Sequence, residues 1–276
     1  MPTTALPDLV HSSGSAESQP PGWPADWPVP TDLSESDAVA MLEPGNRLTQ
    51  PVFHAAYSRT PAGFSAELIQ GVVHVASPLS LLHASPHLKF GQILGIYEDE
   101  TPGVHAADNA STVLTNIGEV QPDLLMRVRR DHGGQTTTFS TIGGSVVRSD
   151  DDGDYVSGGP EFVLEISRAS FTVDTGDKRH DYLAGGVREY LVADARRRTL
   201  LWYDLASGAD TPTPLPDDGI LRSRTMPGLW LNVPALFRRQ GREARKTLEE
   251  GLATPEHAAF VEQLAAANRA YRESHA

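Results

Sequence analysis

The chain has 276 residues, of which 39% are hydrophobic, enough for one medium-sized domain with a core of its own. The absence of cysteine excludes disulfides, a thiolate nucleophile and cysteine-bound metal sites, and it fits a cytoplasmic location. The formal net charge of −13 argues against a protein held on nucleic acid by bulk charge, because phosphate binding needs clustered Lys and Arg side chains.

The N-terminal segment is rich in Pro, Ser and Gly, most densely in QPPGWPADWPVPTD. This composition favours neither helix nor sheet, and it contains neither a secretory signal nor a membrane span. Residues 1–45 are therefore predicted to be a flexible tail that Trp23 and Trp27 could pin to the body. Residues 46–205 are expected to form an α/β core, and residues 206–276 a C-terminal extension ending in helix.

The first half of the core begins with AELIQGVVHV, which reads as two short strands around Gly71. A helix is expected to begin with Ser85 as N-cap and Pro86 in the first turn, and to run past Tyr97. Strand patterns follow at 104–116 and in VQPDLLMRVRR. The glycine-rich stretch from Asp131 to Gly159 predicts loops and an edge hairpin.

The second half continues with the strand patterns FVLEIS, EYLVAD and TLLWYDL. A helix is predicted between the first two of them, from about Asp174 to Ala184, and Gly185–Gly186 would end it. The last helical region has AAFVEQLAAANRAY as its clearest segment. This order of elements predicts the α/β (α+β) class, with a mixed β-sheet flanked by helices.

Two predicted strands each carry an acid among apolar residues. Asp123 precedes Leu124, Leu125 and Met126, and Glu165 stands between Leu164 and Ile166. Side chains alternate along a strand, so neighbouring strands could bring the two carboxylates to one point. Close carboxylates repel each other unless a cation lies between them, and hard oxygen ligands suit Mg²⁺ or Mn²⁺.

A structural role is the alternative for these acids. A lone acid in a strand usually lies at an edge or pairs with a basic residue, and Arg127 and Arg129 share the predicted face of Asp123. In that case the protein would be a structural oligomer whose acid pair is salt-bridged to these arginines.

The order and spacing of several segments resemble the Uma-two family of endonucleases, in the PD-(D/E)XK restriction-endonuclease-like superfamily. The similar segments are AELIQGVVHVASP, HASPHLKFGQIL, VQPDLLMRV, PEFVLEIS, DKRHDYLAGGVREYLVAD and DDGILRSRTMPGLWLNVPALF, which together cover about residues 60–240. The resemblance implies a restriction-endonuclease-like fold and hydrolysis of phosphodiester bonds in nucleic acid, with DNA the expected substrate.

Carried over by position, the resemblance makes Asp123 and Glu165 the metal ligands, with the backbone carbonyl of Ile166 as a third. Glu67, in the opening strand, is a weaker catalytic candidate. The superfamily lysine is expected two residues after the second acid, where this chain has Ser167, so Lys178 on the following helix is the substitute.

Two histidines and the oligomeric state complete these expectations. His83 and His87 could lie near the site, although a helix-capping or surface role fits their sequence context better. Ser167 and the acidic net charge also leave open a binding or regulatory protein that keeps the nuclease fold without turnover. A homodimer is plausible, because one acidic protomer offers little basic surface to a duplex.

Overall fold

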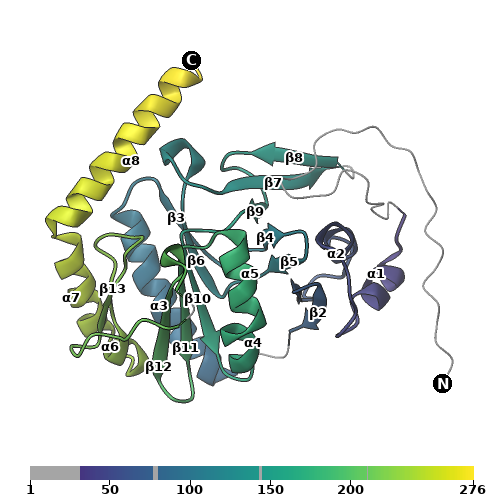
Figure 1. Ribbon diagram of the computed structural model, residues 1–276, viewed down its shortest axis with the longest axis horizontal. Helices are drawn as coiled ribbons and strands as arrows, with labels where there is room; N and C mark the ends of the chain where they lie inside the picture. The colour runs from purple at the N-terminus through teal and green to yellow at the C-terminus, as the bar shows by residue number, and fades with distance from the viewer. Residues whose placement is uncertain (1–31, 77–79, 143–144, 210) are drawn as a thin grey trace.

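The computed structural model describes residues 32–276 apart from 77–79, 143–144 and 210 (Figure 1). The helices are α1 (Glu35–Met41), α2 (Gln50–Tyr57), α3 (Leu81–Asp99), α4 (Phe171–Thr175), α5 (Asp177–Gly185), α6 (Val233–Phe237), α7 (Gly241–Leu252) and α8 (Pro255–Ser274), with short 3-10 turns η1 (Arg130–His132) and η2 (Leu205–Ser207). The strands are β1 (Ala66–Ile69), β2 (Val72–Val75), β3 (Val104–Asp108), β4 (Thr112–Thr115), β5 (Gly118–Val120), β6 (Leu124–Val128), β7 (Thr137–Ile142), β8 (Ser145–Ser149), β9 (Tyr155–Ser157), β10 (Phe162–Ser167), β11 (Glu189–Asp194), β12 (Thr199–Asp204), β13 (Ile220–Arg222) and β14 (Trp230–Asn232).

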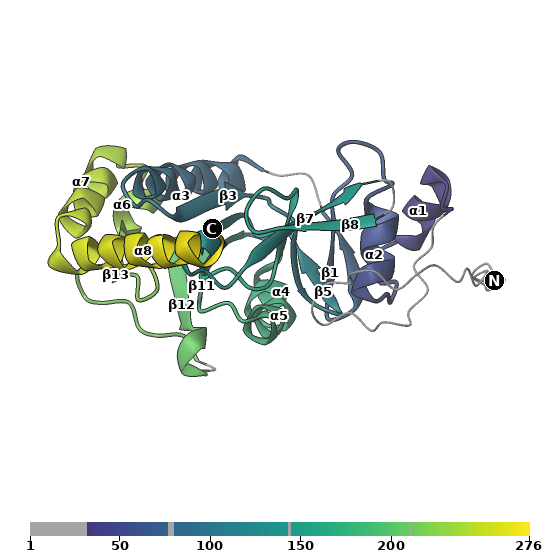
Figure 2. The ribbon, with the colours of Figure 1, turned by 90° about the horizontal axis from the view of Figure 1, so that it is seen from above.

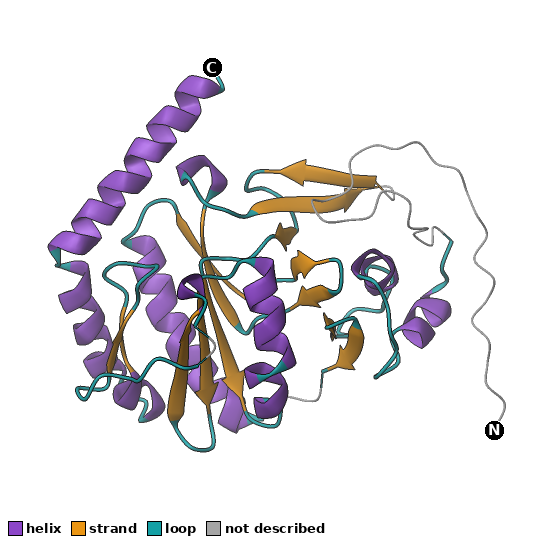
Figure 3. Cartoon of the chain, viewed as in Figure 1, coloured by secondary structure: helices purple, strands orange, loops and turns teal. Residues whose placement is uncertain are grey.

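A five-stranded mixed sheet forms the centre of the molecule, in the order β12-β11-β10-β6-β3. β10 and β11 run parallel, because α4 and α5 connect them, while the other neighbouring pairs are antiparallel. Figure 3 shows the strands of this sheet side by side, with helices next to them. The predicted mixed sheet flanked by helices is confirmed.

A second sheet contains seven strands in the order β2-β1-β5-β4-β9-β7-β8. The chain passes from this sheet into the central one within three residues, because β5 ends at Val120 and β6 begins at Leu124. Asp123 therefore lies at the junction of the two sheets. The predicted edge hairpin is present as β7 and β8, and the two strands around Gly71 are β1 and β2.

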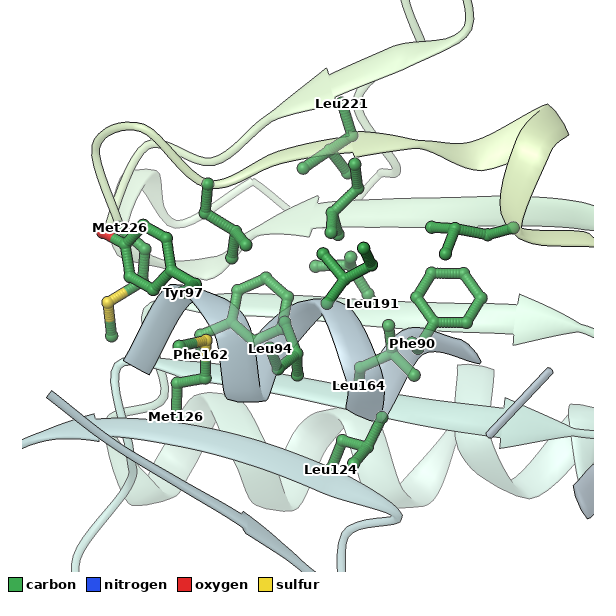
Figure 4. Packing of buried hydrophobic residues seen from close by; sticks show 14 of the residues in the cluster. Phe90, Leu94, Tyr97, Leu124, Met126, Phe162, Leu164, Leu191, Leu221 and Met226 are labelled. Atoms are coloured by element: carbon green, nitrogen blue, oxygen red, sulfur yellow. The ribbon is translucent and has the colours of Figure 1, made fainter. Parts of the chain in front are cut away.

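Alternation along the strands gives the central sheet two apolar faces. Leu124, Met126, Phe162 and Leu164 point to the face covered by α3, where they pack with residues of the β13–β14 hairpin (Figure 4). Leu125 and Val163 point to the opposite face, towards Tyr182 of α5 and Tyr190 of β11. The face assignment predicted for both strands is correct, and it places Glu165 on the α5 side.

The first long helix begins earlier than predicted. α3 begins at Leu81 after the N-cap Ser80, so Pro86 lies inside the helix and not at its start. Proline has no N–H to donate to the Leu82 carbonyl, which costs one backbone hydrogen bond. Contacts of His83 and His87 with the loop before β6 hold the additional turns in place.

The second predicted helix is interrupted. Gly176 separates α4 from α5 with φ −108° and ψ −105°, and a Cβ atom there would come within 2.8 Å of the Thr172 carbonyl oxygen. The prediction of one continuous helix from Asp174 to Ala184 is therefore wrong. Its predicted end is correct, because Gly186 caps α5 in the left-handed conformation.

Part of the segment predicted as tail forms a helix. Trp23 and Trp27 lie outside the described residues, but residues 35–41 form α1, whose first turn is capped by the Ser34 hydroxyl. Ala38 and Leu42 are buried against α2 and the β1–β2 pair. The burial of these two apolar side chains offsets the conformational entropy that is lost when the short helix forms.

We expect Leu42→Ala to lower the free energy of unfolding by about 3 kcal/mol, because the side chain is 1% exposed and its removal leaves a cavity. Urea unfolding of the full chain measures this loss. Met41→Ala, in the same turn but only half-buried, is the control and should cost clearly less. An unchanged stability in Leu42→Ala would show that α1 does not pack on the core in solution.

The helices of the two chain ends lie at opposite ends of the molecule (Figures 1 and 2). α1 and α2 cover the β1–β2 end, while α6, α7 and α8 lie at the other end. α8 is tied to η1, where the Asn268 amide donates to the Asp131 carbonyl oxygen. Within the residues that the structure describes, no helix has both the length and the apolar character needed to cross a bilayer.

Candidate active site

Asp123 and Glu165 lie beside each other on antiparallel neighbours. Leu124 of β6 pairs with Leu164 of β10 in the antiparallel register. Asp123, the residue before Leu124, therefore lies opposite Glu165, the residue after Leu164. The Ile166 N–H donates to Asp123 Oδ2 at 2.6 Å, and the Asp123 N–H approaches Glu165 Oε2 at 3.4 Å. The two acids that the sequence predicts to converge therefore do so, through reciprocal backbone contacts across the strand pair.

Lys178 reaches this pair from α5. Its Nζ lies 2.8 Å from Glu165 Oε1 and 2.7 Å from Glu67 Oε1, and the side chain is only 4% exposed. Glu67 comes from β1 of the other sheet and also accepts the Gln121 N–H at 2.6 Å. Lys178 thus joins the two sheets at their junction, and its ammonium group points at the acids and not at solvent, as predicted.

His83 and His87 contact Asp123 directly, which corrects the expectation of a capping or surface role. His83 Nε2 lies 3.1 Å from Asp123 Oδ1, and His87 Nε2 lies 2.8 Å from the Asp123 carbonyl oxygen. Their rings stack at 5.8 Å between centroids. The sequence signal was their spacing of four residues, which places both on one side of a helix, but the predicted helix began too late to show it.

Two further side chains of the site were not predicted from the sequence. The Tyr182 hydroxyl donates to Glu165 Oε1 at 2.6 Å, one helical turn after Lys178. Asp174 of α4 is 3% exposed and accepts from the Ser170 hydroxyl at 2.6 Å. The i, i+4 spacing of Lys178 and Tyr182 on α5 is the sequence feature that could have indicated the tyrosine.

The site holds an excess of negative charge. Burial is the largest influence on Glu165 and raises its pKa well above the usual value, and Lys178 opposes only part of that rise. Burial alone would lower the pKa of Lys178, but Glu165, Glu67 and Asp174 outweigh it and raise that pKa well above its usual value. The lysine is therefore cationic at neutral pH, among more carboxylates than it can neutralise.

Asp123 is balanced by histidine. Burial would raise its pKa, but the contact with His83, the Ile166 N–H and the charge of Lys178 together lower it. Burial would likewise lower the pKa of His83, and the Asp123 carboxylate raises it overall. Asp123 is thus ionised at neutral pH, beside an imidazole whose pKa the same contact raises.

The arginines that could have explained Asp123 structurally have other partners. Arg127 forms a buried ion pair with Asp151 at 2.8 Å, and Arg129 lies within 3.5 Å of the same carboxylate. Alternation along β6 places Arg127 and Arg129 on the same face as Asp123, but both lie farther along the chain, towards η1. The interpretation of the site acids as partners of these two arginines is therefore wrong.

The acids open into a cleft between the two sheets. The cleft has a volume of about 790 Å³ and is lined by Glu67, Asp123, Glu165, Ile166 and Lys178, together with residues that include His83, Arg168, Asp174 and Asn109. Ser167 is completely buried, and its Oγ makes no hydrogen bond of normal geometry to any described residue. Five sequence-predicted site residues thus line one cleft.

The donor set fits a divalent cation of the Mg²⁺ type. Among the described residues no group of three or more His, Asp or Glu side chains has the arrangement of a complete protein metal site. Mg²⁺ does not require one, because it is usually held by one or two carboxylates and keeps several water or substrate oxygens. The pair Asp123 and Glu165 and the carbonyl of Ile166 supply such a partial set, and Lys178 offsets only part of the burial of Glu165, which favours a further cation there.

A family model and a solved structure are similar to this chain. The family model described as "Uma2: Putative restriction endonuclease" matches residues 52–234, which include all the site residues above. A crystal structure of "a putative nuclease belonging to DUF820" from Anabaena variabilis is similar, with 13% sequence identity, 66% of this chain and 96% of that chain covered, and a TM-score of 0.48. No curated protein sequence matches the chain.

The mixed sheet with two acids on adjacent strands and a lysine on the following helix is a restriction-endonuclease-like fold. The family match spans about two thirds of the chain. The chain therefore belongs to the Uma2 family of restriction-endonuclease-like proteins.

Proposed function

We propose that the protein is a metal-dependent endonuclease that hydrolyses phosphodiester bonds of DNA in the cleft between its two sheets. The observation that carries this proposal is the convergence of Asp123, Glu165 and Lys178 on one point: Glu165 contacts the Asp123 N–H through one carboxylate oxygen and Lys178 Nζ through the other. Asp123, Glu165 and the Ile166 carbonyl would hold Mg²⁺ or Mn²⁺. When bound, the cation supplies electrostatic stabilisation of the phosphate and a more acidic water.

Lys178 takes the role that the superfamily gives to the lysine two residues after the second acid. A hydroxyl at Ser167 cannot provide positive charge, but the ammonium from α5 reaches the same carboxylate at 2.8 Å. Lysine has three donors, and Glu67 and Glu165 take two of them. The third can bind a phosphate oxygen and stabilise the charge that develops there.

The other side chains position these groups. Glu67 is held by the Gln121 N–H and anchors Lys178, so we assign it a positioning role in place of the weaker catalytic one expected from the sequence. Tyr182 fixes the Glu165 oxygen that Lys178 also uses. His83 contacts Asp123, and this contact lowers the pKa of the Asp123 carboxyl group.

Cleavage of closed circular plasmid DNA tests the proposal. We expect nicked and linear products with Mg²⁺ or Mn²⁺ and none after a chelator removes the metal, because Lys178 alone leaves the site with excess negative charge. Readdition of the metal should restore cleavage. DNA that stays intact with either metal, at protein concentrations where it is bound, would favour a nuclease fold without turnover.

A further inference from the structure

A second pocket, with a volume of about 260 Å³, lies outside the acidic cleft. Arg198, Arg238 and Arg239 line it together with apolar residues that include Leu82 and Pro86 of α3. Arg198 belongs to the turn between β11 and β12, whereas the other two arginines follow α6. Three arginines from two separate segments therefore line one hollow in a protein whose net charge is −13.

These arginines are not used by the fold. In the part of the chain that the structure describes, no carboxylate lies within ion-pair distance of Arg198, Arg238 or Arg239, and all three are exposed. Arg197, their neighbour in the β11–β12 turn, is by contrast bound to Asp194 at 2.7 Å. The pocket thus offers unneutralised donors to an anion.

Two of the three arginines adopt a backbone conformation that disfavours them. Arg198 has φ +56° and Arg239 has φ +61°, in the left-handed region where turns and helix ends usually place Gly or Asn. Only two other non-glycine residues of the described chain share this feature, Gln70 and Asn109, and Asn109 lines the acidic cleft. Strain of this kind persists where a side chain is needed for binding.

The pocket lies at the same edge of the central sheet as the acids. β10 and β11 run parallel, and Ser167 at the end of one pairs with Asp194 at the end of the other, directly before the turn that carries Arg198. Leu82 lines the pocket, and its neighbour His83 contacts Asp123. The start of α3 therefore contributes side chains to both the arginine pocket and the acidic cleft.

We propose that Arg198, Arg238 and Arg239 form a phosphate subsite that binds the nucleic-acid backbone beside the scissile position. Planar guanidinium groups bind phosphate oxygens in pairs of hydrogen bonds, and the pocket has room for a phosphodiester group. Arg168, on the rim of the cleft, continues the positive charge towards the acids. The subsite rests on the proposed nuclease function and explains how a protein of net negative charge holds a polyanion: through a local basic surface.

Binding of a fluorescein-labelled DNA duplex to the full-length protein, in chelator so that no cleavage occurs, tests the subsite. We expect the double variant Arg198→Gln/Arg239→Gln to bind about tenfold more weakly and with a salt dependence reduced by roughly one ion per lost phosphate contact. The control Arg196→Gln/Arg272→Gln removes the same charge from exposed residues that do not line the pocket, and it should bind like the wild type.

A second pair of variants separates binding from a structural role. Arg198→Gly and Arg239→Gly relieve the left-handed strain, so their melting temperatures should equal or exceed that of the wild type while DNA binding falls. A lower melting temperature with unchanged binding would show that the arginines serve the turns, and would overturn the subsite.

The outcomes distinguish the subsite from the proposed function. If the wild type cleaves plasmid with Mg²⁺ but the pocket variants bind and cleave like the control, the subsite is wrong and the nuclease stands. If the wild type binds DNA through the pocket but never cleaves it, the nuclease is wrong and the subsite stands. If the pocket variants lose binding to phosphatidylserine vesicles and not to DNA, the nucleic-acid assignment is overturned.

Discussion

Glu165→Gln is expected to lower the rate of plasmid cleavage roughly a thousandfold, because it removes one of the two charged oxygen ligands that the proposed metal needs. The amide keeps the acceptor oxygen that Tyr182 and Lys178 contact, so the metal-free protein should unfold at a temperature close to that of the wild type. Asp123→Asn should have an effect on cleavage of the same size. Single-turnover assays with excess protein measure both rates.

Glu161→Gln is the matched control for this experiment. Glu161 lies directly before β10, four residues ahead of Glu165, and is 4% exposed, but its carboxylate accepts the N–H groups of Val128 and Gln135 at the far end of the strand. Cleavage by this variant should equal that of the wild type once its fold is verified. If Glu161→Gln and Glu165→Gln lose the same activity, the effect comes from the sheet and not from a metal site.

Lys178→Ala is expected to lower the rate roughly a hundredfold through lost stabilisation of charge on the phosphate, while the metal still binds. The same change leaves Glu165 buried without its cation and should cost the metal-free protein about 3 kcal/mol. Added Mg²⁺ can replace part of the missing charge. The rise in melting temperature on adding Mg²⁺ should therefore be larger in Lys178→Ala than in the wild type.

Tyr182→Phe provides the comparison for the lysine. It removes the other donor to Glu165 Oε1 but leaves every charge in place, so cleavage should fall less than tenfold. Cleavage that survives in Lys178→Ala and is lost in Tyr182→Phe would show that the orientation of Glu165, and not the lysine charge, is what the site requires.

The faces of the central strands were predictable from the sequence because they depend on local alternation. Leu124, Met126, Leu164 and Ile166 share one cluster, as the period of two requires. The exact span of α3 was not predictable, because Pro86 is a strong signal for a helix start and the contacts that override it are made by His83 and His87 with a residue some forty positions later in the chain.

The residues of the candidate site also divide into those that local sequence patterns could indicate and those that depend on contacts between distant segments. Asp123 and Glu165 could be brought together by reasoning about neighbouring strands, and Lys178 could be placed near them because its helix follows the strand of Glu165 in the chain. The contribution of Glu67 depends on the meeting of two sheets, which no local pattern encodes. The arginine pocket likewise arises from turns that are distant in sequence and close in space.

Calorimetric titration of the full-length protein with Mn²⁺ tests most directly whether the two strand acids form a metal site. The account predicts binding of one Mn²⁺ per protomer to the wild type, binding that is lost in Asp123→Asn and kept in Glu161→Gln. The two variants differ only in which buried acid becomes an amide, one inside the cleft and one outside it. Equal Mn²⁺ binding by the wild type and Asp123→Asn would contradict the account.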